Sequence, residues 1–211
     1  MKILAHRGFW LERSEQNTFT AFSRAFSHGY GIETDLRDFH GRIVISHDPP
    51  LEAGIYFEDL LVLHEQIDKS TSLALNVKSD GLQLALSPII KSTGLIDYFL
   101  FDMAIPDAIQ HMRSGFSCFT RQSEYEASPS FYELALGVWM DEFDSHWIDN
   151  QMILDHIHNN KRICIVSPEL HGRPHESEWL QYRKITQLIP TDAIMLCTDH
   201  PVQANKFFNQ E

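Results

Sequence analysis

Short apolar runs typical of buried β-strands alternate with runs typical of amphipathic helices along the chain, and this alternation limits the folds most strongly. Strands that alternate with helices predict parallel βαβ units, whose crossover connections are right-handed. We expect eight strands, at residues 2–6, 31–37, 72–78, 98–103, 117–121, 137–141, 162–167 and 193–199. Eight such units are the number in a closed (β/α)8 TIM barrel, and a length of 211 residues is near the lower limit for that fold.

Helices are expected between these strands, at residues 18–28, 57–67, 82–93, 106–114, 130–135, 150–160, 176–188 and 201–208. An extended arm at residues 41–47 is expected after the second strand. Because no linker, low-complexity segment or block of charge divides the chain, we predict one α/β domain over residues 1–211. A doubly wound open sheet is the alternative, but that fold commonly has a glycine-rich first turn, which this sequence lacks.

The charge balance argues against several classes of protein. The chain has 17 Lys and Arg against 29 Asp and Glu, a formal net charge of −12, whereas nucleic-acid binders need clustered basic residues. No apolar run approaches the roughly 18–20 residues of a membrane-spanning helix, and the first residues do not resemble a secretory signal. The three cysteines form no disulfide or zinc pattern. We therefore expect a cytoplasmic protein with buried thiols, without nucleic acid as a partner and without stable insertion in a membrane.

Polar residues gather at the carboxyl ends of the predicted strands. In chain order these ends carry His6, Arg7, Glu33, Asp35, Arg37, Asn76, Lys78, Asp102, Arg121, Asp141, Glu169 and Asp199. In a barrel the carboxyl ends converge on one face, where barrel enzymes have their active sites. Burying an unpaired charge costs several kcal/mol, so a whole ring of such residues indicates a functional site rather than the ordinary ends of core strands.

Two carboxylates on one strand indicate a bound cation. Glu33 and Asp35 share a strand face because side chains alternate, and they would repel each other strongly without a cation between them. Oxygen ligands suit Mg²⁺ or Ca²⁺ rather than zinc or copper. Asn76 and Lys78 repeat the spacing on the next strand, with an oxygen donor followed by a cationic side chain. A divalent ion beside Lys78 and Arg7 predicts a substrate that contains phosphate.

Histidines provide candidates for acid–base catalysis. His6 and His47 each end a strand-like run and precede a charged residue, and a pair of this kind can exchange protons near neutral pH. The candidate contacts to the rest of the substrate are Trp10, Arg121, Trp139, Asp141, Glu169 and His171. Five histidines in helix-like runs are expected to be solvated, namely His28, His64, His111, His156 and His158.

These residues occur in an order that resembles the glycerophosphodiester phosphodiesterase family. The resemblance is dense over roughly the first 80 residues and returns at the last strand. The motifs that carry it are His6-Arg7-Gly8, Asn17-Thr18, Glu33-Thr34-Asp35, His47-Asp48, Asn76-Val77-Lys78 and Thr198-Asp199-His200-Pro201.

The resemblance implies a (β/α)8 barrel that binds one divalent cation and hydrolyses phosphodiesters of lipid metabolism. By that resemblance His6 and His47 are the acid–base pair, and Lys78 contacts the phosphate. Glu33 and Asp35 are cation ligands. A substrate hydroxyl beside the phosphorus would attack it while one histidine takes the proton and the other protonates the leaving alcohol, with a cyclic phosphate as an intermediate or a product.

Three departures from the family pattern affect these expectations. Asn76 stands where the family usually has a third acidic ligand, so the ligand set loses one negative charge and Asp102 is the first candidate to replace it. Gln16 stands where the family commonly has Glu, and Glu15 compensates only if the loop shifts by one residue. Residues 49–71 form a short connection without a large cap insertion, so glycerophosphocholine-type compounds are doubtful substrates.

Two other functions stay open beside a hydrolase acting on a small-molecule phosphodiester. The loss of charge at Asn76 is compatible with a non-catalytic barrel that binds a phosphorylated sugar or headgroup. A lyase that stops at the cyclic phosphate would use the same residues.

Overall fold

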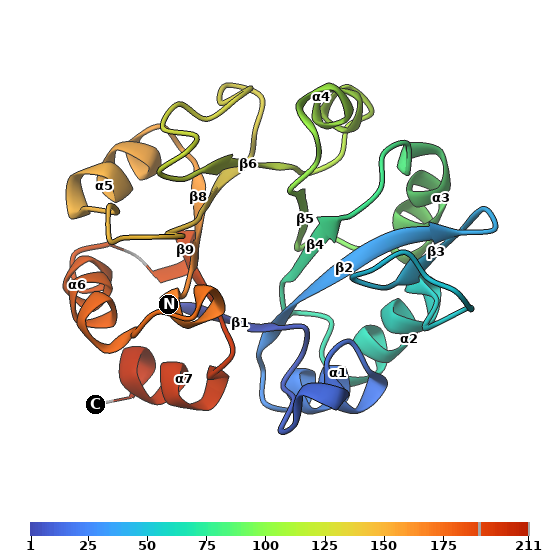
Figure 1. Ribbon diagram of the computed structural model, residues 1–211, viewed down its shortest axis with the longest axis horizontal. Helices are drawn as coiled ribbons and strands as arrows, with labels where there is room; N and C mark the ends of the chain where they lie inside the picture. Colours follow the sequence, from blue (N-terminus) through green and yellow to red (C-terminus); the bar gives the residue numbers. More distant parts are fainter. Residues whose placement is uncertain (190, 211) are drawn as a thin grey trace. The chain divides into compact units, whose positions relative to one another are not determined.

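A computed structural model describes residues 1–189 and 191–210 of the chain. The described residues form two compact units, one from Ala5 to Cys118 and the other made of Met1–Leu4 together with the chain from Phe119 onward. Strand β1 (Lys2–His6) contributes residues to both units. Figure 1 labels the helices and strands along the chain.

The unit from Ala5 to Cys118 contains the elements that carry most of the candidate site. They are α1 (Phe19–Ser27), β2 (Gly31–Phe39), β3 (Arg42–Ile45), α2 (Phe57–Ile67), β4 (Leu73–Val77), α3 (Gln83–Thr93), β5 (Tyr98–Phe101) and α4 (Ile105–Arg113), with a short 3-10 turn at Arg13–Glu15. The strand order is β5-β4-β2-β1. The predicted extended arm at residues 41–47 contains β3, which pairs with β2 in antiparallel direction.

The second unit repeats the alternation of strand and helix. Its elements are β6 (Phe119–Gln122), β7 (Gly137–Met140), α5 (Asn150–His158), β8 (Arg162–Val166), α6 (Glu176–Thr186), β9 (Ile194–Thr198) and α7 (Pro201–Asn209), with 3-10 turns at Pro168–His171 and Thr191–Ala193. The strand order is β1-β9-β8-β7-β6, and the neighbours from β6 to β9 pair in parallel direction.

The predicted fold class is confirmed. Eight parallel strands and seven α-helices in the described part of the chain follow one another in the order of a (β/α)8 barrel. The connection between β3 and α2 consists of residues 46–56 and contains no large cap insertion. In the register of β2 with β4, Asp35 lies opposite Asn76 and Glu33 lies opposite Ala74. Because opposite residues of paired strands share a face, this register brings the predicted oxygen ligands together.

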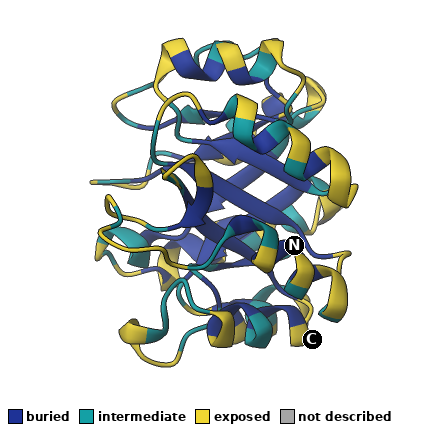
Figure 2. Ribbon diagram, turned by 90° about the vertical axis from the view of Figure 1, so that its right-hand side faces the viewer, coloured by how far each residue is buried: buried dark blue, intermediate teal, exposed yellow. Residues whose placement is uncertain are grey.

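Burial explains why these segments form these elements. Figure 2 shows the strands buried along most of their length, while each helix has a buried and an exposed side. In α1, Ala21, Phe22, Ala25 and Phe26 recur at helical spacing and are buried. The Thr18 side chain accepts a hydrogen bond from the Ala21 amide at 3.3 Å and thereby caps the helix.

One predicted helix is wrong. Residues 130–134 form turns, not a helix. Phe131 has φ +53°, a left-handed conformation that a helix cannot contain, and the Ser130 carbonyl accepts a hydrogen bond from the Thr120 hydroxyl at 2.6 Å. Six residues are also too few to form a stable helix without strong tertiary support.

The prediction that the helical histidines are solvated is wrong for three of the five. His64, His111 and His156 are buried, whereas His28 and His158 are exposed. Each buried ring has polar partners. His64 Nε2 lies 3.0 Å from the Thr71 carbonyl oxygen, and burial lowers the pKa values of His64 and His156.

The three cysteines are buried thiols outside any disulfide, as expected. Burial raises the pKa of Cys118 to about 12. Among the described helices, none is long and apolar enough to cross a membrane.

Candidate functional site

A tight turn after β1 places His6 and Arg7. Arg7 has φ +55° and Gly8 has φ +87°. A Cβ atom on Gly8 would lie 2.8 Å from Ala21 Cβ, so the turn needs glycine both for its backbone angle and for the close approach of α1. The indole nitrogen of Trp10 donates to the His6 carbonyl oxygen at 3.0 Å and ties the loop back to the strand.

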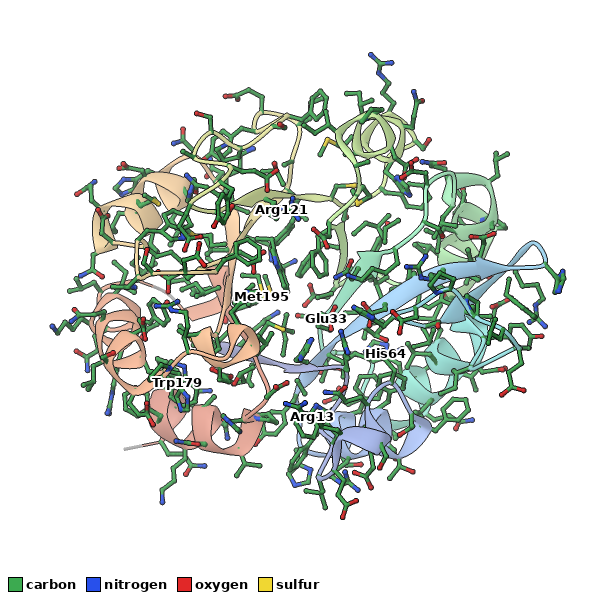
Figure 3. All side chains as sticks on the ribbon, in the orientation of Figure 1. Arg13, Glu33, His64, Arg121, Trp179 and Met195 are labelled. Atoms are coloured by element: carbon green, nitrogen blue, oxygen red, sulfur yellow. The ribbon has the colours of Figure 1, made fainter. Side chains whose placement is uncertain are left out.

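The two carboxylates of β2 are held beside this turn. The Arg7 amide donates to the Glu33 carbonyl oxygen at 2.9 Å, and His6 Nε2 lies 3.8 Å from Glu33 Oε2. Glu33 is labelled in Figure 3 on β2. Glu33 and Asp35 are 3% and 1% exposed, so both acidic groups are withdrawn from water.

Cationic and amide groups surround Asp35. Its Oδ2 accepts a hydrogen bond from Asn17 Nδ2 at 2.9 Å and lies 3.4 Å from Arg7 Nε. Its Oδ1 lies 3.6 Å from Lys78 Nζ. Asn17 Oδ1 in turn accepts a hydrogen bond from the Thr34 hydroxyl at 2.8 Å. Thr34 precedes Asp35 on β2, so two neighbouring residues of this strand fix the orientation of the Asn17 amide.

Two oxygens in this cluster fit a cation. Within the part of the chain that the structure describes, Asp35 Oδ1 and Asn76 Oδ1 are buried side-chain atoms without a hydrogen-bond donor. Buried polar atoms almost always have hydrogen-bond partners, so two acceptor atoms without a donor on paired strand residues are compatible with a bound cation. With Glu33 they make an all-oxygen donor set of the kind that Mg²⁺ and Ca²⁺ prefer. The residues present therefore fit the expected divalent cation.

The protonation of Glu33 agrees with this interpretation. Burial, and second the neighbouring Asp35 carboxylate, raise the pKa of Glu33 to about 7, although His6, Arg7 and Lys78 act in the opposite direction. Additional positive charge beside a carboxyl group with a raised pKa favours the loss of its proton. A divalent cation would supply that charge.

His47 is placed by the antiparallel arm. The Ser46 amide donates to the Asp35 carbonyl oxygen at 3.0 Å, and Arg37 Nε donates to the His47 carbonyl oxygen at 2.9 Å. The ring is about half exposed, and its Nδ1 lies 2.9 Å from Asp48 Oδ1. This pairing leaves Nε2 as the nitrogen that can accept or donate a proton to a ligand.

Lys78 and Asp102 follow the ends of β4 and β5. Lys78 Nζ lies 3.6 Å from Asp102 Oδ2, the same distance that separates it from Asp35 Oδ1. Asp102 was expected as a third cation ligand, and the structure pairs its carboxylate with this lysine.

The outer contacts of Arg7 explain the departure at Gln16. Arg7 NH1 donates to Gln16 Oε1 at 3.5 Å, so the neutral amide keeps the contact that a glutamate would make. Glu15 does not compensate, because it pairs with Arg24 at 2.8 Å and accepts a hydrogen bond from the Leu11 amide. The Arg24 hydrogen bond is the largest cause that lowers the pKa of Glu15 to about 2.

The remaining predicted contacts belong to the second unit and interact with one another. Asp141 accepts a hydrogen bond from Trp139 Nε1 at 3.0 Å, and His171 Nε2 lies 3.0 Å from its other oxygen. Arg121, labelled on β6 in Figure 3, is ion-paired with Glu126. Their role as substrate contacts stays a prediction.

Glu169 links the ends of β8 and β9. Its carboxylate accepts hydrogen bonds from the hydroxyls of Ser167 and Thr198, and from the Asp199 amide at 3.2 Å. These contacts give Glu169 a structural role, and contact with a substrate stays a prediction for this residue as well.

A second acidic cluster was missed from the sequence. Glu142, His146 and Glu178 have ligand atoms close enough to hold a metal ion. The Glu142 carboxylate is already saturated, because Oε1 is 2.8 Å from His146 Nδ1 and accepts from the amides of Trp147 and Ile148, while Oε2 accepts from the Tyr182 hydroxyl at 2.5 Å. We interpret this group, the Glu142 cluster, as a structural hydrogen-bond network.

The sequence matches no protein-family model and no curated protein. Solved structures do share its fold. A glycerophosphodiester phosphodiesterase from Agrobacterium tumefaciens is 16% identical with a TM-score of 0.67, and 98% of each chain is covered. A phosphodiesterase from Oleispira antarctica, solved with sn-glycerol-3-phosphate as product, is 15% identical with a TM-score of 0.69, covering 98% of this chain and 96% of the other.

A third similar structure is a glycerophosphoryl diester phosphodiesterase from Parabacteroides distasonis, 14% identical with a TM-score of 0.68. It covers 98% of this chain and 85% of the other. Two of these three structures are therefore glycerophosphodiester phosphodiesterases, the family that the sequence motifs resemble, and the third is a phosphodiesterase.

Proposed function

We propose that this chain is a divalent-cation-dependent phosphodiesterase that cleaves a glycerophosphodiester-like compound to a phosphomonoester and an alcohol. The observation that carries the proposal is the buried pair Glu33 and Asp35. Among the described residues Asp35 Oδ1 has no hydrogen-bond donor, it lies 3.6 Å from Lys78 Nζ, and Asp35 lies opposite Asn76 in the sheet. The similar folds of three phosphodiesterases support it.

Glu33, Asp35 and Asn76 would hold one Mg²⁺ or Ca²⁺ through their side-chain oxygens. The bound ion would supply positive charge to the non-bridging phosphate oxygens. Lys78 and Arg7 add positive charge at the same site, where each lies within 3.6 Å of a carboxylate oxygen of Asp35.

His6 and His47 provide the proton transfers. His47 Nδ1 is paired with Asp48, which favours the tautomer with a free Nε2 and makes His47 the candidate base for the attacking hydroxyl. His6 would then donate a proton to the oxygen of the leaving alcohol. After the P–O bond breaks, the alcohol carries the proton from His6, His47 keeps the proton of the attacking hydroxyl, and the phosphate is left cyclic. In a second step water would attack the cyclic phosphate and give a proton to His6, while His47 returns its proton to the ring oxygen that leaves, which yields the phosphomonoester.

The alcohol groups on either side of the phosphorus of this small-molecule substrate would be contacted by further residues. Trp10, Arg121, Trp139, Asp141, Glu169 and His171 are the residues we propose for them. The sn-glycerol-3-phosphate in the Oleispira antarctica structure supports a glycerol phosphate product and a place in lipid metabolism for this chain also. A cytoplasmic location is part of the same proposal.

Hydrolysis of an activated chromogenic phosphodiester tests the proposal. We expect turnover with added Mg²⁺, Ca²⁺ or Mn²⁺, and loss of turnover with a chelator or in His6→Ala. His158→Ala is the matched control, because His158 is exposed on α5. Turnover that is unchanged in His6→Ala would show that His6 has no catalytic role.

A non-catalytic barrel that binds a phosphorylated sugar or headgroup is the second candidate, and the neutral Asn76 favours it. Tight binding of a glycerol phosphate in the presence of chelator, without turnover under any cation, would support it. A lyase is distinguished by a cyclic phosphate that accumulates as the final product.

A further inference from the structure

Lys78 is shared between two carboxylates. Its Nζ lies 3.6 Å from Asp35 Oδ1 and 3.6 Å from Asp102 Oδ2. Both distances exceed that of a normal charged hydrogen bond, about 2.8 Å. The ammonium group therefore lies between two anions without being bound closely to either.

The carboxylate of Asp35 cannot serve Lys78 and a cation equally. Its Oδ2 is held by Asn17, and Oδ1 has no hydrogen-bond donor among the described residues, so Oδ1 is the atom offered to a cation. A divalent ion bound there would repel the Lys78 ammonium group, because the two positive charges would share one oxygen. Lys78 then needs another anion near its present position.

Asp102 is placed to provide that anion. It directly follows β5 and has φ +67°, a left-handed conformation that is uncommon for residues other than glycine. Such backbone conformations persist where the surrounding structure holds them, and they gather at functional sites. The side chain is 25% exposed, against 1% for Asp35, so Asp102 can hold a charge pair at the edge of the cluster.

We propose that Asp102 is a positioning residue, which draws Lys78 away from Asp35 when a divalent cation binds and holds the ammonium group for the substrate phosphate. This inference rests on the proposed cation site of Glu33 and Asp35. It gives Asp102 a role through Lys78, in place of direct coordination of the cation.

A double-mutant cycle tests the inference without using activity. Mn²⁺ binding is measured by calorimetry for the wild type, Asp102→Asn, Lys78→Met and the double variant. Asparagine tolerates a left-handed backbone, so Asp102→Asn should keep the fold, which circular dichroism checks. Asp38→Asn is the control for loss of an exposed carboxylate on β2.

We expect Asp102→Asn to weaken Mn²⁺ binding by about tenfold, since Lys78 is then left to compete for Asp35. Lys78→Met should bind Mn²⁺ at least as tightly as the wild type. The double variant should match Lys78→Met within about twofold, because Asp102 acts only through the lysine.

Two results would overturn the inference alone. If Asp102→Asn weakens Mn²⁺ binding equally in the wild type and in Lys78→Met, Asp102 is a cation ligand. If it weakens Mn²⁺ binding in neither, Asp102 does not act on the cation site. Absence of Mn²⁺ binding by the wild type is a different outcome, which overturns the proposed cation site together with this inference.

A second readout separates positioning from a structural role. With saturating Mn²⁺, Asp102→Asn should raise KM for a phosphodiester about tenfold and change kcat by less than about threefold, because binding of phosphate by Lys78 is impaired in the ground state and the transition state alike. A fall in kcat at unchanged KM would contradict the proposed role.

Discussion

Asn17 holds Asp35 in one orientation. Its Nδ2 donates to Asp35 Oδ2 at 2.9 Å, and its Oδ1 accepts the Thr34 hydroxyl at 2.8 Å. The backbone of Asn17 has φ +56°, and its amide donates to the Arg7 carbonyl oxygen at 2.9 Å. Asn17 therefore joins the loop after β1 to the acidic strand, and Asp35 Oδ1 stays without a hydrogen-bond donor among the described residues.

Removing this amide should weaken cation binding without unfolding the protein. Glycine accepts the left-handed backbone, so Asn17→Gly keeps the loop and deletes only the side chain. We expect Mn²⁺ affinity to fall about tenfold, because Asp35 loses a hydrogen bond that fixes it. Asn17→Ala, which adds backbone strain, should also lower the melting temperature. Unchanged Mn²⁺ affinity in both variants would show that Asn17 does not orient the ligand.

Glu33 should make the stability of the cation-free protein dependent on pH. Its pKa in the folded protein is raised to about 7, first by burial and then by Asp35. The bound proton stabilises the folded protein fully below about pH 4.5, the ordinary pKa of a glutamate, and this stability is lost as pH rises through the raised pKa of about 7. In chelator, the wild type should therefore lose stability relative to Glu33→Gln as pH rises from 5 to 8. A difference in melting temperature that does not change with pH would contradict the shifted pKa.

Introducing an acid at position 76 should tighten cation binding. Asn76 lies opposite Asp35, so Asn76→Asp adds a negative charge directly to the proposed ligand set. The number of charged ligands sets the affinity of Ca²⁺ sites, and we expect a gain on the order of tenfold. Without cation the same variant should be less stable, because a third buried carboxylate joins Glu33 and Asp35. Calorimetry tests this, with the exposed Gln66→Glu as the control for added charge.

The Glu142 cluster should contribute stability and bind no cation. Glu142→Gln replaces one oxygen of a saturated, buried carboxylate with a donor, and we expect the free energy of unfolding to fall by about 2–4 kcal/mol. Tyr182→Phe should have a smaller effect in the same direction. Mn²⁺ affinity should not change in either variant. Loss of a bound equivalent of Mn²⁺ in Glu142→Gln would instead identify a second metal site.

Sequence patterns predicted the features that depend on local periodicity. The alternation of strands and helices gave the fold class, and the alternation within β2 placed Glu33 and Asp35 on one face. Asn76 opposite Asp35 follows from parallel pairing of neighbouring strands. These features need only the side-chain period of a strand and the order of the elements.

Features that depend on distant partners could not be predicted in this way. His156 looks like a surface residue of an amphipathic helix, but its ring is buried between Gln122 and Tyr132, which are 34 and 24 residues away in the chain. Glu142 gave no signal beyond a carboxylate after a strand, because its donors include Tyr182 on α6. The pairing of Lys78 with Asp102 was missed for the same reason, since it joins residues that follow two different strands.

Phosphorus NMR of the reaction with a panel of glycerophosphodiesters tests the central claim most directly. With Mg²⁺ or Ca²⁺ present, we expect the wild type to convert the phosphodiester signal to that of a phosphomonoester, and we expect no conversion in chelator or by Glu33→Gln. A cyclic phosphate that persists would identify a lyase. Conversion that is equal in chelator and in Glu33→Gln would contradict a cation-dependent site on β2.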